Sequence, residues 1–181
     1  MPKLYMDQLQ WKHWPMTLGV TSKGLRVLEF KSMDEIADRE KKRNPELEVV
    51  LDKKAAAPYR QQVEQYFEGD REVFDVPLDL NGTAFQLRVW HFLLSIPYGK
   101  VACYQEAAEA AGNVKAVRAA GMANNRNPVS VVVPCHRVVG KNGALVGYGG
   151  GLDMKEALLS LEGISVDNKR ITEASAWMKN R

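Results

Sequence analysis

Cys135 and His136 are the residues whose types and spacing point most directly to covalent chemistry. They are neighbours in Pro134-Cys-His-Arg137, which directly follows the apolar run Val129–Val133. Thiolate is the reactive form of cysteine, and it needs a base or a positive field to persist near neutral pH. Because side chains of adjacent residues usually point apart, we expect a bridging water to carry the thiol proton to His136.

Such a pair also needs a carboxylate that orients the imidazole and stabilises its charged form. Glu162, 27 residues after Cys135 at the end of the last predicted helix, is the candidate. The alternative is a buried structural cysteine beside a histidine with satisfied hydrogen bonds, because unpaired cysteine is commonly buried and inert. The tetrapeptide alone leaves both interpretations open.

The composition is that of an ordinary globular chain. Of its 181 residues, 45% are hydrophobic and 26% are charged, close to average usage. No apolar run approaches the roughly 18 residues of a membrane helix, so we expect no membrane partner. The polar N-terminus predicts no secretory signal. Two cysteines and three histidines without ligand spacing predict no metal and no cofactor, and the expected compartment is the cytoplasm.

Charge is divided unevenly along the chain. Residues 1–82 hold 13 Lys and Arg against 15 Asp and Glu, whereas residues 83–181 hold 12 against 7, so the two parts carry −2 and +5. A basic segment with few acids is the electrostatic pattern of a protein that binds a phosphate backbone. Chance variation of a solvated surface is the alternative, which charge alone leaves open.

The first 82 residues predict a small α/β domain. Apolar runs at 16–20 and 25–30 flank a turn and predict an antiparallel hairpin. Residues 33–43 are charged and fit either a surface helix or a loop. A helix is predicted from Pro58 to Gly69, with one apolar face. Residues 77–82 read as an extended linker, where we place the domain boundary.

The second part is richer in helix. Thr83 is a good N-cap for a helix to Leu94. Two shorter helices, over 103–111 and 115–124, are separated by a glycine-containing turn and resemble a helix-turn-helix. This signal is weak by itself, because any helical hairpin looks similar.

The segment around Cys135 completes the second domain. Residues 129–133 predict a buried strand that leads to the cysteine, and a helix starting near Leu152 packs on the core. The domains are therefore expected at 83–163 and, before it, at 1–82. Residues 164–181 are expected to form a polar, partly unstructured tail.

Motifs along the second domain resemble the O6-alkylguanine-DNA alkyltransferases, or methylated-DNA–protein-cysteine methyltransferases. Pro134-Cys-His-Arg-Val-Val139 is similar to the active-site segment of that family. Other similar segments follow in family order and spacing: Thr83-Ala-Phe-Gln, Val89-Trp90, Ile96-Pro-Tyr-Gly-Lys-Val101, Tyr104, Arg118-Ala-Ala-Gly121, Asn127-Pro128, Gly147-Tyr-Gly-Gly150 and Leu158-Leu-Ser-Leu-Glu-Gly163. The first domain is assigned by order and length only. Some members hold a structural zinc there, but residues 1–82 contain one histidine and no cysteine.

The resemblance implies an α+β fold: a ribonuclease-H-like N-terminal domain with an antiparallel sheet, then a mostly helical domain with a winged helix-turn-helix. It implies DNA repair by direct, irreversible, single-turnover transfer of a methyl or larger alkyl group to Cys135. The implied partner is double-stranded DNA containing O6-alkylguanine, with O4-alkylthymine left open as a second lesion. The base would be flipped from the minor groove by a monomer.

Residues at matching positions acquire implied roles. Cys135 would accept the alkyl group, His136 would be its base, and Glu162 would hold His136. Tyr104 would donate a proton to guanine, and Asn127 would brace the turn before the cysteine. Arg118 would enter the base stack as a finger, with Tyr104, Lys115 and Asn124 as further DNA contacts. The substrate pocket would be formed by Val138, Tyr148, Gly149 and Ser130.

Two other function classes are compatible with parts of the sequence. A DNA-binding regulator that senses alkylation through its cysteine would need base-reading side chains, and residues 115–124 offer few of them. A Cys-His hydrolase or amidase would need an oxyanion hole and repeated turnover. A strong site preference on DNA would favour the regulator, and multiple turnovers without protein alkylation would favour the hydrolase.

Overall fold

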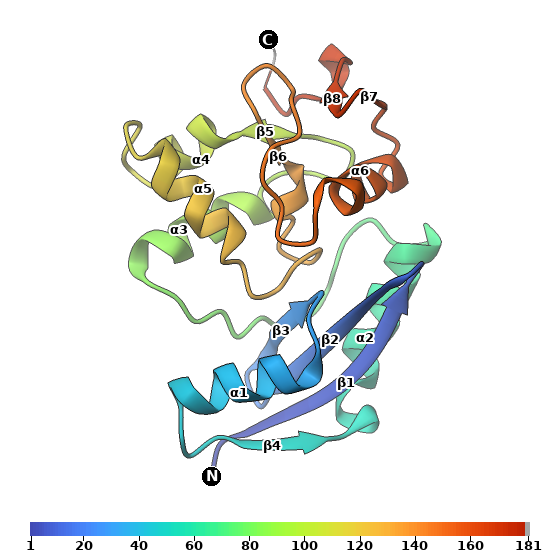
Figure 1. Cartoon of the computed structure of the whole chain (residues 1–181), viewed down its shortest axis with the longest axis vertical. Coiled ribbons are helices and arrows are strands. Elements are labelled where there is room, and N and C mark those ends of the chain that lie inside the picture. The colour runs from blue at the N-terminus through green and yellow to red at the C-terminus, as the bar shows by residue number, and fades with distance from the viewer. Residues whose placement is uncertain (180–181) are drawn as a thin grey trace. The chain divides into compact units, whose positions relative to one another are not determined.

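The computed structural model describes residues 1–179 and divides the chain into two compact units, Met1–Asn81 and Gly82–Arg181. The first unit is a sheet with two helices, and the second is mostly helical (Figure 1). The expected α+β class is confirmed. The division falls one residue before the end of the first domain predicted from the sequence.

Four strands form the sheet of the first unit, in the order β3-β2-β1-β4. They are β1 (Lys3–Trp11), β2 (Trp14–Thr21), β3 (Gly24–Glu29) and β4 (Glu48–Leu51). The predicted hairpin is confirmed as β2 and β3, and β1 and β2 are also antiparallel. β4, however, is parallel to β1, so the sheet is mixed rather than wholly antiparallel. The chain reaches β4 through helix α1 (Met33–Arg43), the kind of crossover that parallel pairing requires.

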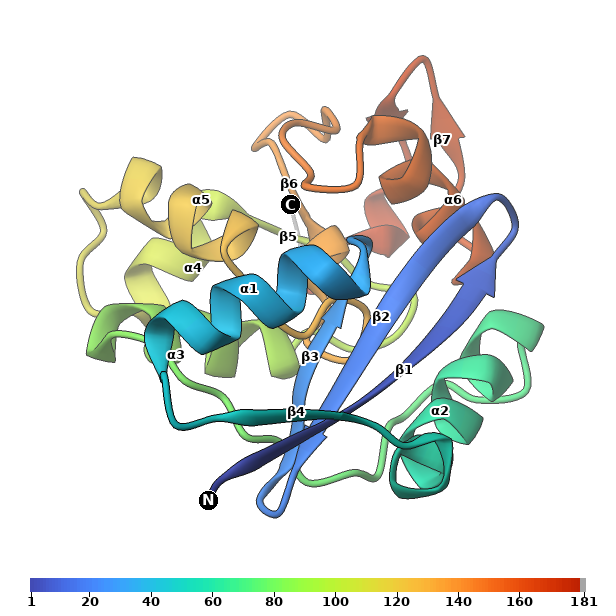
Figure 2. The same ribbon diagram turned by 60° about the horizontal axis from the view of Figure 1, so that its bottom comes forward.

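Helices α1 and α2 (Lys53–Glu68) pack on opposite faces of this sheet (Figure 2). Ile36 of α1 packs with Leu4 and Met6 of β1. On α2, the ring of Phe67 stacks on Trp11 of β1 with centroids 4.7 Å apart. Even- and odd-numbered side chains of one strand point to opposite faces, which explains how β1 serves both helices.

Capping residues set where these two helices begin and where α2 ends. Ser32 and Glu35 form a reciprocal capping box, which makes residues 33–43 a helix rather than a loop. Asp52 accepts hydrogen bonds from the backbone N–H groups at the start of α2, so this helix begins five residues before Pro58, where the sequence had placed its start. Gly69, in the left-handed conformation with φ +83°, ends α2 as predicted.

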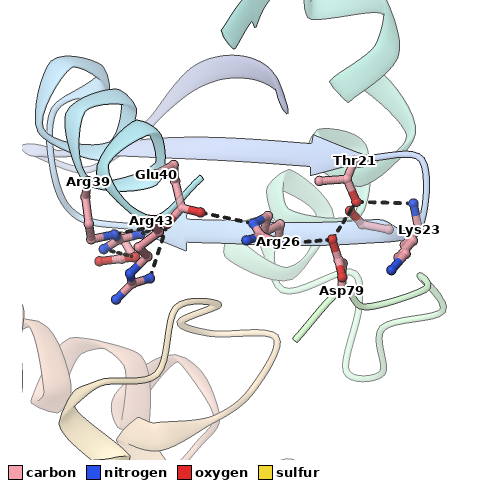
Figure 3. A network of polar contacts seen from close by, with 9 residues as sticks. Thr21, Lys23, Arg26, Arg39, Glu40, Arg43 and Asp79 are labelled. Atoms are coloured by element: carbon pink, nitrogen blue, oxygen red, sulfur yellow. Dashed lines mark hydrogen bonds and ion pairs between the residues drawn. The ribbon is translucent and has the colours of Figure 1, made fainter. Parts of the chain in front are cut away.

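A polar network ties the segment after α2 to β3 (Figure 3). Arg26 Nε donates to the buried Glu40 carboxylate at 3.0 Å, and Arg26 Nη1 donates to Asp79 at 3.2 Å. The backbone N–H of Leu25 donates to Pro77 O, and that of Asp79 donates to Leu25 O, both at 2.9 Å. Residues 77–79 are therefore held to β3 by an isolated bridge, and the linker expected over 77–82 is shorter than predicted.

The second unit begins with α3 (Ala84–Leu94), whose predicted N-cap, Thr83, is confirmed by a capping box. Its further elements are β5 (Ala102–Cys103), α4 (Tyr104–Ala110), α5 (Val117–Asn125), the 3-10 helix η1 (Cys135–Arg137), β6 (Val138–Val139), α6 (Leu152–Leu161), β7 (Val166–Asp167), β8 (Arg170–Ile171) and the 3-10 helix η2 (Ala174–Ala176). Helices α4 and α5 are the predicted helix pair. Buried Trp90 of α3 donates its indole N–H to Ala123 O of α5 at 2.8 Å and so fixes the pair to the core.

A two-stranded parallel pairing brings the chemistry-bearing segments together. β5 pairs with β6 through Ala102–Val138 and Cys103–Val139. Tyr104 begins directly after β5, and η1 with Cys135 ends directly before β6. The tyrosine and the cysteine are therefore held near each other although 31 residues separate them in the sequence.

The strand predicted over 129–133 is a tight turn instead. Val133 N donates to Val129 O at 2.9 Å and Val132 N donates to Ser130 O at 2.9 Å, which an extended chain does not allow. Val131 has φ +74°, a conformation that is strained for a β-branched residue. The run is apolar because it is buried, and burial alone does not distinguish a strand from a packed turn.

The C-terminal segment is ordered, unlike the partly unstructured tail expected at 164–181. Within the described residues 164–179, Ile164, Ile171 and Ala176 are buried in a cluster with Val101 and Val139. Backbone bonds also hold the segment, including Leu145 N to Lys169 O at 2.8 Å and Val101 N to Ala176 O at 2.7 Å. Its polar residues lie on the outer side, which is why composition alone suggested a tail.

We expect Ile171→Ala to destabilise the second unit by about 2–4 kcal/mol, because the substitution leaves a cavity in this cluster. Thr172→Ala, at the exposed neighbouring position, should change the free energy of unfolding by less than about 0.5 kcal/mol. Urea unfolding followed by circular dichroism measures both. Equal effects of the two substitutions would contradict packing of the segment.

Candidate active site around Cys135

Cys135 lies in η1, not at the end of a strand, and its side chain is almost inaccessible, with 4% exposure. Burial raises the pKa of its thiol, while hydrogen bonds from Asn127 and Ser130 and the charge of Lys155 act in the opposite direction. The net shift is upward, so the resting group is a thiol. A base must therefore remove its proton before the sulfur can attack a carbon.

Asn127 holds the turn that presents Cys135. Its side-chain nitrogen donates to Val133 O at 2.7 Å, and its side-chain oxygen accepts from Val129 N at 3.0 Å. Both ends of the strained turn at Val131 are thus fixed by one buried amide. The expected bracing position of Asn127 agrees with this geometry, and the residue also lies against the sulfur.

His136 is completely buried, and its Nε2 lies 2.8 Å from Oε1 of Glu162. Burial is the main cause that lowers the pKa of His136, and the carboxylate of Glu162 opposes it. A carboxylate only accepts hydrogen bonds, so Nε2 carries the hydrogen of the neutral ring. The remaining nitrogen, Nδ1, then has the lone pair that takes a proton.

Glu162 is the centre of a wider set of contacts than the sequence suggested. The guanidinium of Arg137 donates to both carboxylate oxygens at 2.8–3.1 Å, and Gly99 N donates at 3.2 Å. A further bond, from Arg137 Nη1 to Ile96 O at 2.6 Å, fixes the guanidinium. Burial disfavours the ionised carboxylate, but His136 and Arg137 outweigh it and lower the pKa of Glu162 to about 2.

Tyr104, at the start of α4, reaches the loop after β6. Its hydroxyl donates to Val146 O at 2.8 Å, and the amine of Lys155 lies 3.5 Å from the same hydroxyl oxygen. Burial and the nearby Cys135 raise the pKa of Tyr104 to about 12. The tyrosine therefore keeps its proton at neutral pH and is able to donate it.

The residues expected to touch DNA do not share one environment. Arg118 on α5 and Lys115 in the preceding turn are exposed, as a phosphate or base contact requires. Asn124, at the other end of α5, is 1% exposed, and its side-chain nitrogen lies 3.3 Å from Cys135 O. The structure does not support the DNA contact expected of Asn124. Asn124 lies in the interior of the second unit, between α5 and Cys135.

The expected pocket residues differ in accessibility. Ser130 is half-buried and hydrogen-bonds the thiol, whereas Gly149 is exposed. Val138 is buried, and its carbonyl accepts from the amine of Lys155 at 2.5 Å. Tyr148 is half-buried with an inaccessible hydroxyl.

Residues 1–179 contain neither a metal-binding cluster nor a membrane-spanning helix. No cluster of three or more His, Cys, Asp or Glu side chains has the geometry to hold a metal ion. No helix there has the length and apolar character to cross a bilayer.

Family models identify the class of protein that this fold and site define. The ribonuclease-like domain of 6-O-methylguanine DNA methyltransferase matches residues 4–80, and its DNA-binding domain matches residues 84–164. Together they cover most of the chain, which therefore belongs to the 6-O-methylguanine DNA methyltransferase family.

Individual relatives agree with this assignment. The chain is 44% identical over 163 residues to the inducible methylated-DNA–protein-cysteine methyltransferase of Bacillus subtilis, covering 89% of this chain and 91% of the relative. It is 42% identical to the Methanosarcina barkeri enzyme of that name, over 88% and 97% of the two chains. The crystal structure of O6-methylguanine methyltransferase from Mycobacterium tuberculosis superposes with a TM-score of 0.76 at 38% identity, covering 88% of this chain and 92% of that one. A structure of the M. tuberculosis protein with DNA superposes with a TM-score of 0.72 at 37% identity, over the same shares.

Two residues of the site were missed by reasoning from the sequence. The sequence motifs give no role to Arg137, yet its guanidinium binds Glu162 directly. The motifs give no role to Lys155 either, although its amine contacts Tyr104 and its charge influences Cys135. The sequence signal for Lys155 is its position on the apolar face of the last helix, because lysine is almost never fully buried unless its charge is paired.

The depressed pKa of Glu162 makes a prediction for stability against pH. In the unfolded state the carboxylate of Glu162 binds a proton near pH 4.5, whereas in the folded state it binds one only near pH 2. The free energy of unfolding therefore falls as pH falls through this window. The contribution present above pH 5 and lost by pH 2 is about 3 kcal/mol. Glu162→Gln should remove this part of the dependence and reduce stability at pH 7, measured by urea unfolding at each pH. Glu156→Gln, in the partly exposed pair with Lys169, is the control and should retain the dependence. An unchanged acid profile in Glu162→Gln would contradict the assignment.

Proposed function

We propose that this chain repairs DNA by moving the alkyl group of O6-alkylguanine to the sulfur of Cys135, once per molecule. The observation that carries the proposal is the buried thiol of Cys135 next to His136, whose ring is fixed by Glu162 at 2.8 Å. Membership of the methyltransferase family supports the same substrate. The chemistry needs no metal or cofactor.

The residues of the site support a reaction in successive steps, in which protons and electron pairs balance. The thiol proton of Cys135 passes to Nδ1 of His136, through a water if the two do not touch, and Glu162 stabilises the imidazolium. The sulfur then forms a bond to the alkyl carbon while the bond from that carbon to O6 breaks. The electron pair stays on guanine, which takes the hydroxyl proton of Tyr104. The thioether has no easy reverse step, so each molecule reacts once.

Access to the buried sulfur requires the base to leave the helix. Rotation of a nucleotide out of the stack costs a few kcal/mol, and an alkylated guanine pairs less strongly, which reduces that cost. Arg118 is exposed on α5, and the accessible residues that follow it are small: Ala119 is exposed and Gly121 is half-buried. A helix with a small surface and one long cation fits a minor groove and fills the vacated space.

The alternatives receive less support from the site. A sequence-reading regulator needs several base-reading side chains on α5, and Asn124 is buried rather than available. A hydrolase would turn over repeatedly on a small amide or ester, whereas the relatives of this chain bear the name of protein-cysteine methyltransferases. We further propose that the protein acts as a monomer, because one chain supplies Cys135, His136 and Glu162. A cytoplasmic location fits a chemistry that requires reduced thiol.

Duplex DNA with radiolabelled O6-methylguanine tests the proposal. We expect one label per protein molecule on the peptide that contains Cys135, with a mass gain of one methyl group, and none in Cys135→Ala. Cys103→Ala is the matched control, because Cys103 is also buried but lies in β5, before the start of α4, and this variant should remain labelled. Release of methanol with unlabelled protein would overturn the proposal.

Arg118→Ala tests the finger role. Removing the exposed guanidinium should slow repair of duplex DNA by about 10-fold or more, because no side chain then fills the space that the rotated base leaves in the stack. Reaction with free O6-methylguanine should change less than about 2-fold, because no base has to be flipped. Single-turnover rates on both substrates measure the effect, with Lys23→Ala in the first unit as a charge-matched control. Equal loss on duplex and free base would exclude the role.

A further inference from the structure

Asn124, near the end of α5, is a buried amide of which only one end is used. Its side chain is 1% exposed, and its nitrogen donates to Cys135 O at 3.3 Å. Its oxygen, Oδ1, is shielded from solvent and receives no hydrogen bond from any group within residues 1–179. Because a carbonyl only accepts hydrogen bonds, the nitrogen must face Cys135 O, and Oδ1 is therefore the open end of the amide.

Asn127 shows by contrast what a structural amide looks like in the same region. It is also buried, but its nitrogen donates to Val133 O and its oxygen accepts from Val129 N, so both ends are used. A buried amide oxygen without a donor costs free energy, whereas an apolar side chain of the same shape leaves no group unpaired. Position 124 thus carries an acceptor that packing alone does not require.

The carbonyl oxygen of Cys135, in contrast, is fully occupied. It accepts from the backbone N–H of Val138 as well as from the side chain of Asn124. A carbonyl oxygen has two lone pairs, and these two donors use both. A donor group of a ligand that arrives beside Cys135 therefore finds Oδ1 of Asn124 open, rather than Cys135 O.

The proposed substrate carries a donor that suits this acceptor. Guanine has an exocyclic amine, whereas thymine has a carbonyl oxygen at the corresponding edge. A stacked base cannot reach a side chain inside the second unit, but a base that has been rotated out lies next to Cys135. The sulfur is itself only 4% exposed, so the opening that admits the base to Cys135 also gives it access to the neighbouring amide.

We propose that Asn124 is a specificity-determining residue whose Oδ1 accepts a hydrogen bond from the exocyclic amine of the rotated O6-alkylguanine. The inference rests on the proposed alkyl transfer and adds to it a contact that reads the base. The new hydrogen bond forms without breaking an existing one, because Oδ1 is unfilled. The carbonyl oxygen of O4-alkylthymine would face the same acceptor and be repelled, so Asn124 favours the guanine lesion.

Two duplex substrates that differ only in the amine test the contact: one carries O6-methylguanine and the other O6-methylhypoxanthine. The wild type should transfer the methyl group to Cys135 about 5- to 100-fold faster from methylguanine, because the other base leaves Oδ1 unpaired. Without its amine the base pairs less strongly and rotates out more easily, so its slower reaction would not come from base flipping.

Asn124→Leu should reduce this rate ratio to less than about 2-fold by slowing the reaction of methylguanine alone, since leucine cannot accept from the amine. Asn125→Leu, at the exposed neighbouring position, is the matched control and should keep the wild-type ratio. An amide that only holds Cys135 in place would make Asn124→Leu slow both substrates by the same factor, and that result would overturn the proposal.

Two further measurements do not depend on the folding of Asn124→Leu. Asn124→Ala removes the same acceptor without adding bulk and should give the same reduced ratio. In the wild type alone, equal rates on the two substrates would show that no acceptor reads the amine, and the proposal would be wrong. If wild-type Cys135 gains no methyl group from either substrate, the proposed function fails; if it gains one and the ratio is the same in every variant, only the role of Asn124 fails.

Discussion

Burial of the Glu162 carboxylate is the constraint on which the geometry of the site depends. An ionised carboxylate inside a protein is stable only when donors surround it, and here His136, Arg137 and the backbone at Gly99 supply them. The same contacts determine which imidazole nitrogen is basic and join α6 to η1. Removal of the charge would therefore affect proton transfer and packing together, which makes the site a structural element of the unit as well as its reactive centre.

Two buried cations, Arg137 and Lys155, accompany the carboxylate of Glu162. Arg137 neutralises Glu162 on one side, and Lys155 lies on the other side near Cys135 and Tyr104. In a medium of low polarity each charge has a large effect on its neighbours, so the thiol and the phenol are weak acids until a base or a cation assists them. Such a site is inert in the resting protein, which suits a thiol that can be used only once.

The sequence predicted those features that depend on local patterns. The hairpin in residues 16–30, the N-cap at Thr83 and the C-cap at Gly69 follow from turn and capping chemistry within a few residues. The pairing of β4 with β1, the turn at Val131 and the buried position of Asn124 depend on contacts between distant segments. Periodicity carries no information about these contacts. The site was located by motif order, but the partners of Arg137 and Lys155 could be identified only in three dimensions.

The packing of the C-terminal segment has a consequence for synthesis. Val101 bonds to Ala176 across 75 residues, and the cluster around it includes Ile171. Contacts so distant in sequence form late, because the loop between them must first be closed. On a ribosome the second unit cannot complete its core until residue 176 has left the exit tunnel. Prematurely terminated chains would then expose apolar surface and be open to proteolysis, so incomplete copies would not persist to compete for damaged DNA.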